Sequence, residues 1–245
     1  MRNLKIKTCT LLLLAAVACT KNQVPSEKSG FVSLSLTTDE LVADMTRSNV
    51  SDYTSLPAAS DFTISIMNSA SEPVWSGKIS EWDSATALPS GNYSVTASYG
   101  SNETEGFDCP YFSGSQSFAI TGGQTTAVKV PVSLRNTVVK IACTQAFKNY
   151  FKDYSFKFSR DNADVVSFVK DEARGAFIDG YKITLSGAMK SEVKDFSFSK
   201  EYTNLDEATA YTFTFDLTNV GGASLSISFN NTTETVDLGD IELNN

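Results

Sequence analysis

The chain has 245 residues, and its 20 Lys and Arg against 28 Asp and Glu give a formal net charge of −8 at pH 7. Phosphate backbones and anionic lipid surfaces are bound by basic surfaces, so this composition argues against a nucleic-acid-binding protein and against a polybasic membrane dock. Histidine is absent, and no phosphate-binding loop, nucleophile elbow or metal-ligand spacing occurs, so we expect neither an enzyme nor a bound cofactor or metal.

The first residues have the parts of a secretory signal. A positively charged segment precedes an apolar run from Thr8 to Ala18, which is too short to remain in a membrane as a spanning helix. The run ends in Ala16-Val17-Ala18-Cys19, which resembles a bacterial lipobox.

The lipobox resemblance implies that residues 1–18 are removed and that Cys19 carries lipid, with a tether over residues 19–29. The alternative is an ordinary secretory signal cut after Ala18. Several acyl chains anchor a protein where a single chain does not. Loss of residues 1–18 removes three of the 20 basic residues and none of the 28 acidic ones, so the formal net charge of the mature chain is −11.

Apolar and polar residues alternate along most of the mature chain, a pattern typical of half-buried β-strands. One apolar face per strand predicts an all-β fold of sheets packed face to face. We expect two tandem β-sandwich domains, over residues 30–135 and 136–245, because strong strand patterns flank a short junction. The clearest alternating rows are Val32, Leu34 and Leu36; Phe62, Ile64 and Ile66; Tyr93, Val95, Ala97 and Tyr99; Val128, Val130, Val132 and Leu134; Val139, Ile141 and Cys143; Phe156 and Phe158; Tyr181, Ile183 and Leu185; Tyr211, Phe213, Phe215 and Leu217; and Leu225, Ile227 and Phe229.

Two segments depart from this alternation. Residues 38–60 are polar with weak periodicity, which indicates a long, partly mobile connection after the first strand. Aromatic residues at positions 147, 150, 151 and 154 recur at helical spacing after Thr144, a candidate N-cap, and predict one short helix in the second domain.

The two halves of the chain echo one another faintly. Leu88-Pro89-Ser90-Gly91-Asn92-Tyr93 introduces one strand, and Leu205, a polar turn and Tyr211 introduce another. We interpret this as two copies of a related sandwich.

Two cysteines remain in the mature chain besides Cys19. Cys109 lies in a loop, whereas Cys143 shares the inward face of a strand with Val139 and Ile141. Export permits a disulfide between them, but a buried thiol at Cys143 suits the pattern as well, and both alternatives stay open.

Trp75 and Trp82 are the candidate glycan contacts, because exposed aromatic faces stack on sugar rings. The competing interpretation is that both pack in the sandwich core. Adjacent acids such as Asp171 and Glu172 are interpreted as solvated loop charges and not as a hydrolytic pair.

Several motifs resemble Bacteroidales lipoproteins of the fimbrillin-like superfamily, closest to an uncharacterised-domain lipoprotein family within it. They are the lipobox, the first strand Gly30-Phe31-Val32-Ser33-Leu34-Ser35-Leu36, and Leu88-Pro89-Ser90-Gly91-Asn92-Tyr93. Pro110-Tyr111-Phe112-Ser113-Gly114-Ser115, the junction around Arg135 and the segment from Phe147 to Tyr154 add to them. The resemblance implies tandem transthyretin-like or Ig-like sandwiches on the outer membrane.

The resemblance also implies assembly into fimbriae by strand exchange with other fimbrillin-like subunits, after proteolysis beyond the first strand. Arg47 lies where such a cut would fall, and Ser84 in Asp83-Ser84-Ala85 matches a short O-glycosylation pattern. The residues after Cys19 lack the acidic cluster of a surface-export signal, so the cell surface and the periplasmic face both remain open.

These features favour a non-enzymatic cell-envelope lipoprotein, a structural or adhesin-type subunit. A surface glycan-binding lipoprotein and an envelope lipoprotein with another role are the alternatives.

Overall fold

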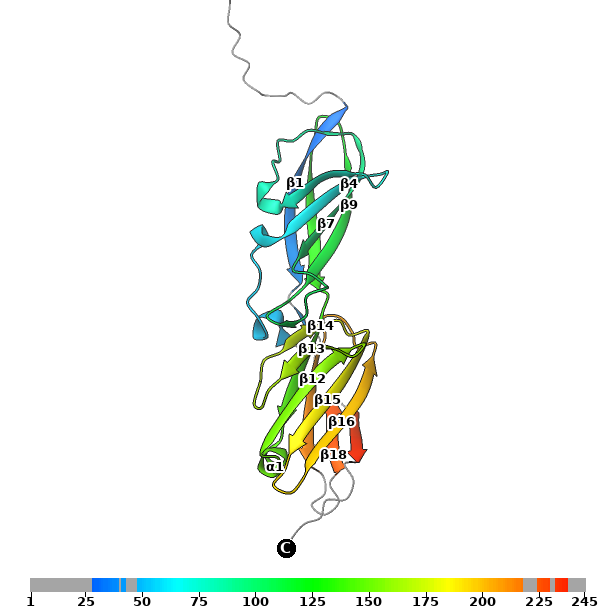
Figure 1. Cartoon of the computed structure of the whole chain (residues 1–245). Helices are drawn as coiled ribbons and strands as arrows, with labels where there is room; N and C mark the ends of the chain where they lie inside the picture. The colour runs from blue at the N-terminus through cyan, green and yellow to red at the C-terminus, as the bar shows by residue number, and fades with distance from the viewer. Residues whose placement is uncertain (1–27, 40, 43–47, 218–223, 230–231, 238–245) are drawn as a thin grey trace, which may run out of the picture.

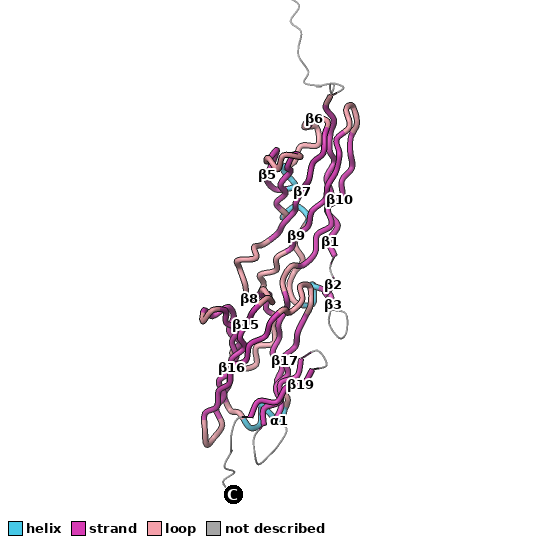
Figure 2. The backbone as a smooth tube through the Cα atoms, turned by 90° about the vertical axis from the view of Figure 1, so that its right-hand side faces the viewer, coloured by secondary structure: helices cyan, strands magenta, loops and turns pink. Residues whose placement is uncertain are grey.

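The computed structural model describes residues 28–39, 41–42, 48–217, 224–229 and 232–237. Figure 1 shows an elongated molecule, with the strands up to β10 in an N-terminal module and those from β11 onward in a C-terminal module. The view turned by 90° in Figure 2 shows the same end-to-end arrangement. The expected all-β sandwich fold is confirmed.

The described chain consists mainly of strands, with a few short helices between them. The N-terminal module contains β1 (Ser29–Asp39), β2 (Leu41–Val42), β3 (Ser48–Asn49), β4 (Thr63–Asn68), β5 (Pro73–Lys78), β6 (Leu88–Pro89), β7 (Gly91–Tyr99), β8 (Gly106–Phe107), β9 (Phe112–Ile120), β10 (Thr125–Leu134) and the 3-10 helices η1 (Val50–Asp52), η2 (Ala59–Asp61) and η3 (Ile79–Glu81). The C-terminal module contains β11 (Thr137–Cys143), α1 (Gln145–Tyr150), β12 (Asp153–Arg160), β13 (Ala163–Phe168), β14 (Ala176–Ile178), β15 (Lys182–Lys190), β16 (Asp195–Thr203), β17 (Ala210–Leu217), β18 (Ser224–Phe229) and β19 (Thr232–Asp237).

The two modules share one arrangement of strands. The order β5-β4-β7-β9-β10-β1-β6 makes up the main sheet of the N-terminal module, and β2 pairs separately with β3. The C-terminal module has the orders β13-β12-β15-β16 and β19-β18-β17-β11-β14, and β8 from the N-terminal module joins the edge of the second sheet beside β14. Thus β5-β4-β7-β9 corresponds to β13-β12-β15-β16, and β10-β1-β6 corresponds to β17-β11-β14, with β18 and β19 added to the second copy.

The first strand of each module runs parallel to a later strand, whereas the remaining pairs in these sheets are antiparallel. β1 pairs with β10 over nine positions, from Phe31 opposite Thr125 to Asp39 opposite Ser133. β11 pairs with β17 over six positions, from Val138 opposite Ala210 to Cys143 opposite Phe215. The echo seen in the sequence linked β7 to β17, which occupy different places in the arrangement, so that alignment of the two halves is wrong.

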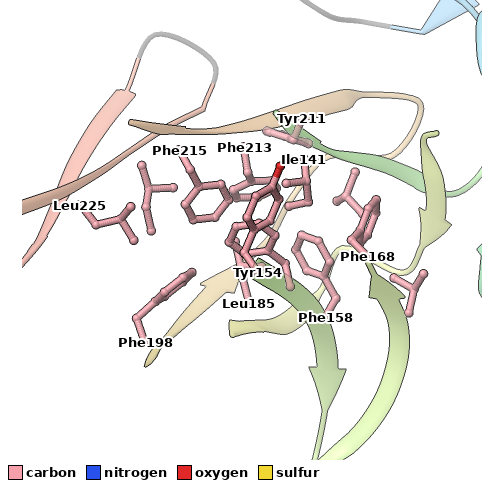
Figure 3. Close-up of a cluster of buried hydrophobic side chains, with 14 of the residues drawn as sticks. Ile141, Tyr154, Phe158, Phe168, Leu185, Phe198, Tyr211, Phe213, Phe215 and Leu225 are labelled. Atoms are coloured by element: carbon pink, nitrogen blue, oxygen red, sulfur yellow. The ribbon is translucent and has the colours of Figure 1, made fainter. Parts of the chain in front are cut away.

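Each module encloses its own cluster of buried apolar side chains. Figure 3 shows the C-terminal cluster, in which aromatic rings from β12, β13, β16 and β17 meet. Phe156 and Phe215 stack with ring centroids 4.1 Å apart, and Phe158 meets Phe213 edge to face at 5.4 Å. The alternation therefore identifies the inward faces of these strands correctly.

The junction between the modules is not a simple linker, because three strands contribute to both clusters. On β14, Phe177 lies in the N-terminal cluster, while its neighbours Ala176 and Ile178 lie in the C-terminal one. Val138 on β11 and Ala210 on β17 also point into the N-terminal cluster. Successive strand residues face opposite sides, so one strand can serve two cores. β8 extends the connection by pairing with β14.

The expected short helix is confirmed. α1 begins after Thr144, whose hydroxyl oxygen accepts a hydrogen bond from the Phe147 N–H at 3.3 Å. This is the N-cap geometry that satisfies an otherwise unpaired helical donor. The aromatic spacing overestimates its length, because Tyr154 lies on β12.

Two other expectations are wrong in part. The segment 38–60, predicted as a long, partly mobile connection, contains β2, β3 and η1, and its Val50 is fully buried in the N-terminal cluster. Tyr181 is not an inward strand residue; it precedes β15, and its side chain is 73% exposed. The apolar alternation in the sequence begins at Tyr181, one residue before β15 itself begins.

Candidate functional site

β1 closes the N-terminal module and is the candidate functional element. Val32 is fully buried, and the half-buried Leu34 and Leu36 pack against the same cluster. Full burial of an aliphatic side chain, as at Val32, contributes roughly 1.5–3 kcal/mol, and the half-buried Leu34 and Leu36 contribute less. The inward side chains that the alternation predicted for this strand therefore attach it to the module.

The outer edge of β1, which faces away from β10, is mostly open. Within the described residues the only strand on that edge is β6, which pairs with Ser29 and Gly30. A β-carbon at Gly30 would lie 2.3 Å from the main-chain oxygen of Thr121, so only glycine fits there. From Phe31 onward, β1 depends on β10 for its ladder.

The side chain of Trp82 forms a hydrogen bond to this open edge of β1. Its indole Nε1–H donates a hydrogen bond of 3.1 Å to the main-chain oxygen of Val32. Lys78 fixes the loop before it, because its main-chain N–H binds the Glu81 carboxylate at 3.1 Å and its ammonium donates to the main-chain oxygen of Asp61. The η3 turn thereby positions an indole donor against β1.

The two tryptophans proposed as glycan contacts lie together but do not form a flat platform. Their ring centroids are 5.2 Å apart and their planes meet at 73°, an edge-to-face contact. Both side chains are half-buried and pack against the N-terminal cluster. A stacking platform for a sugar needs exposed, coplanar rings; glycan contact at Trp75 and Trp82 stays a prediction without support from this geometry.

The other proposed modification sites are only partly placed. Cys19 and Arg47 lie outside the described residues. Ser84 is exposed in the loop after η3, where the Asp83 carboxylate accepts a hydrogen bond from the Ala85 N–H at 2.9 Å. Its accessibility is what an O-glycosylation site requires, and its modification stays a prediction.

The structure places Cys109 and Cys143 as free thiols. The Cys109 thiol donates to the main-chain oxygen of Phe107 at 3.2 Å. Cys143 packs at the margin of the C-terminal cluster, and burial raises the pKa of its thiol to about 12. Of the two alternatives, the structure has the buried thiol.

The carboxylates that stand side by side in the sequence are engaged in separate contacts. Asp171 accepts hydrogen bonds from the Lys148 ammonium at 2.8 Å and the Tyr154 hydroxyl at 2.9 Å. Arg174 hydrogen-bonds to Glu172 and lowers the pKa of that carboxyl to about 2. Neither acid has the raised pKa of a catalytic proton donor.

An ion pair fixes the two modules to each other. Glu105, in the loop before β8, binds Arg160 through two hydrogen bonds of 2.6 and 3.0 Å. Glu105 also accepts the Asp179 N–H at 2.5 Å. Both side chains are largely buried, so this bidentate contact lies in a partly desolvated place. Sequence reasoning missed it because 55 residues separate the partners.

Nowhere in the described residues do three or more His, Cys, Asp or Glu side chains converge as metal ligands would. No helix in the same part of the chain has the length and apolarity needed to cross a membrane.

Comparison with known proteins places the chain in a family. No curated protein matches it. Similar solved structures include a candidate adhesin from Bacteroides thetaiotaomicron (14% identity, TM-score 0.49, covering 87% of this chain and 99% of that one). Another is a fimbrial assembly protein from Parabacteroides distasonis (6% identity, TM-score 0.49, covering 85% and 98%). Residues 28–244 match the family described as Domain of unknown function (DUF4493).

Proposed function

The chain belongs to the DUF4493 family, and from that premise we propose that it is a non-enzymatic subunit of a cell-envelope assembly. In this proposal lipid on Cys19 first holds the protein to the outer membrane, and the edge of β10 that β1 vacates after a cut then accepts a strand from a neighbouring subunit.

The observation that carries the proposal is the attachment of β1. It is the first strand of its module, it pairs with only one long strand among the described residues, and that pairing is parallel. Parallel pairs are slightly less stable per residue than antiparallel pairs. A donor strand entering antiparallel to β10 could therefore match or exceed the ladder that β1 provides.

Removal of β1 would leave a site suited to a donor strand. The inward residues Val128, Val130 and Val132 of β10 would lose their neighbours, and one edge of β10 would lose its hydrogen-bond partners. Exposed strand edges with an adjacent apolar groove bind extended segments through main-chain hydrogen bonds and alternate side chains.

The chemistry of the remaining surface supports a role through binding and not through turnover. Histidine does not occur in the sequence, and the paired acids Asp171 and Glu172 are held in ion pairs. A single envelope lipoprotein that does not assemble is the alternative, and the next experiment separates the two.

Cutting after Arg47 tests the exchange. The mature chain without lipid is treated with an arginine-specific protease, and its mass is followed by light scattering. We expect release of the segment that contains β1 and growth into larger species, because the vacated edge of β10 accepts a strand from another copy. An Arg47→Gln variant controls for cuts elsewhere and should remain monomeric.

Adding a competing peptide makes the test specific to the edge of β10. Excess peptide of residues 30–39 should cap the vacated edge and suppress growth, whereas the same peptide with Asp in place of Leu34 and Leu36 should not. If the cut protein stays monomeric with β1 still bound, strand exchange at this site is wrong.

The anchor is tested independently of assembly. Cys19→Ala should abolish incorporation of labelled palmitate and the lipoprotein-specific cut in the native host. Unchanged labelling in that variant would show that Cys19 is not the lipid site.

A further inference from the structure

A polar groove of about 540 Å³ lies where the two modules meet. Its volume falls within the range of about 300–1,000 Å³ that is typical of sites for small ligands. Residues from both modules line it, including Asn102, Tyr111, Ser113, Ser115, Asp179 and Glu207.

The groove is held in shape by the junction itself. The Tyr111 N–H donates to the Asn136 side-chain oxygen at 2.5 Å, and the Tyr111 carbonyl accepts the Arg135 N–H at 2.8 Å. Asn136 is buried, and Arg135 pairs with Glu207 across the junction at 2.9 Å. Little reorganisation is therefore needed before a ligand binds.

Tyr111 differs from the two tryptophans in what its ring contacts. Its side chain is half-buried, yet it belongs to neither of the two apolar clusters and forms no ring–ring contact with another described aromatic residue. Trp75 and Trp82, by contrast, use their faces and edges within the protein. A tyrosine offers both an apolar face and a hydroxyl group to a ligand.

The groove continues onto a sheet face covered by hydroxyl groups. Thr63, Ser98 and Ser113 are register neighbours across β4, β7 and β9. Ser65, Thr96 and Ser115 form the next row, and Ser94 lies opposite Ser117 in the row after that. No hydrogen bond joins these eight side chains to any other described residue. They form a lattice of neutral donors and acceptors with strands about 4.8 Å apart.

The charges of the groove select among ligands. Arg135 is neutralised by Glu207, and Asp179 adds a further negative charge. The eight hydroxyl residues are uncharged, and Lys78 on β5, the register neighbour of Thr63, lies at the margin of their face with its ammonium hydrogen-bonded to the main-chain oxygen of Asp61. Acidic polymers are thus repelled, while a neutral polyhydroxylated ligand meets matching groups.

We propose that this interdomain groove, with Tyr111 as its stacking surface, binds a neutral glycan. One sugar ring lies against the Tyr111 ring, and its hydroxyl groups exchange hydrogen bonds with Asn102, Ser113 and Ser115. The adjoining hydroxyl face accommodates further residues of an extended chain. This inference does not depend on strand exchange, since both walls of the groove are present in a single copy.

Native affinity electrophoresis of the mature, lipid-free chain tests the proposal. The gels contain either neutral polysaccharides (α-mannan, arabinogalactan and hydroxyethylcellulose) or acidic ones (polygalacturonate and heparin). We expect at least one neutral polysaccharide to retard the protein and the acidic ones to leave its mobility unchanged.

Variants then locate the site. Tyr111→Ala should weaken retardation by at least about tenfold in apparent affinity, because the stacking surface is lost. Asn102→Ala, at an exposed side chain that has no hydrogen-bond partner among the described residues, should weaken it by about three- to tenfold. Thr86→Ala, an exposed polar residue outside the groove, should bind like the parent chain.

Three results would overturn the proposal. The first is the absence of retardation by every neutral polysaccharide. The second is retardation that Tyr111→Ala and Asn102→Ala leave unchanged. The third is retardation that disappears in Trp75→Phe but persists in Tyr111→Ala, which would move glycan binding to the tryptophan pair.

Discussion

Trp75 and Trp82 contact each other edge to face, yet only Trp82 has a hydrogen bond to β1. The carbonyl that it reaches belongs to Val32, a residue with no solvent exposure. A buried acceptor without a partner costs about 1–3 kcal/mol. The indole nitrogen therefore matters for the attachment of the first strand in a way that the ring alone does not.

Replacing this nitrogen gives the first prediction. Trp82→Phe should lower the free energy of unfolding by about 1–2 kcal/mol, because the ring packing is largely kept while the Val32 carbonyl loses its donor. Trp75→Phe is the matched control and should cost less. Urea denaturation followed by far-UV circular dichroism measures both, and equal losses would contradict the assigned role.

Cys143 illustrates how burial controls a reactive group. Because burial raises its thiol pKa to about 12, the folded protein holds almost no thiolate at pH 8. An unfolded thiol ionises near pH 8.5, so stability contributed by this group is complete below about pH 8.5 and falls as the pH rises towards 12.

Labelling rates test this assignment. In a Cys109→Ser variant, also lacking Cys19, iodoacetamide at pH 8 should modify folded Cys143 roughly a thousandfold more slowly than the same protein in urea. The unfolded reaction serves as the internal control. Comparable rates in the two states would mean that the thiol is neither buried nor protonated as described.

Among the elements, β17 is a strand whose buried and exposed faces follow the predicted alternation closely. Tyr211, Phe213 and Phe215 are buried, whereas Thr212 is exposed. Phe213→Ala should lower the free energy of unfolding by about 3–5 kcal/mol, since it loses both transfer energy and packing. Thr212→Ala on the outer face should change it by less than about 1 kcal/mol. Thermal or urea unfolding distinguishes them, and similar effects would mean that the strand faces are reversed.

Alternation predicted the strands well because each has one apolar face, but it could not predict how strands pair. The parallel contact of β1 with β10 joins residues 94 positions apart, from Phe31 to Thr125, and no local pattern encodes it. The two-residue strand β8 is too short to show a period. Tyr181 continues an apolar row although β15 begins after it.

The candidate sites likewise differ in whether neighbouring residues in the sequence can indicate them. Large aromatic residues drew attention to Trp75 and Trp82, and these proved to pack within the protein. The groove beside Tyr111 depends on Asp179 and Glu207 from the other module, so sequence proximity gave no indication of it. In the sequence, the Pro110-Tyr111-Phe112 stretch indicated a family resemblance and not a binding site.

At the scale of the whole molecule, the shared strands predict that the modules unfold together. Both tryptophans lie in the N-terminal module, so their fluorescence reports on that module alone, while circular dichroism reports on both. Because Phe177 on β14 fills the N-terminal cluster, the two signals should change at the same urea concentration in the parent chain.

Phe177→Ala should separate the two signals, since it removes the largest side chain that the C-terminal module places in the N-terminal cluster. Phe213→Ala, confined to the C-terminal cluster, should lower stability by a similar amount, about 3–5 kcal/mol, and keep the signals coincident. Separate transitions already present in the parent chain would contradict the coupling.

The parallel pairing of β1 with β10 also determines how the protein bears tension. β1 begins at the end of the molecule remote from the C-terminal module, and β10 ends at the junction (Figure 1). In the uncut chain, a pull between the N-terminal end and the C-terminal module enters β1 at Ser29 and leaves β10 at Leu134. Since the two strands run in the same direction, this load slides one along the other and strains all nine paired positions at once. An antiparallel hairpin pulled from its two ends would open one pair at a time. Forced unfolding is governed by the unfolding rate, so this geometry favours slow mechanical failure under load.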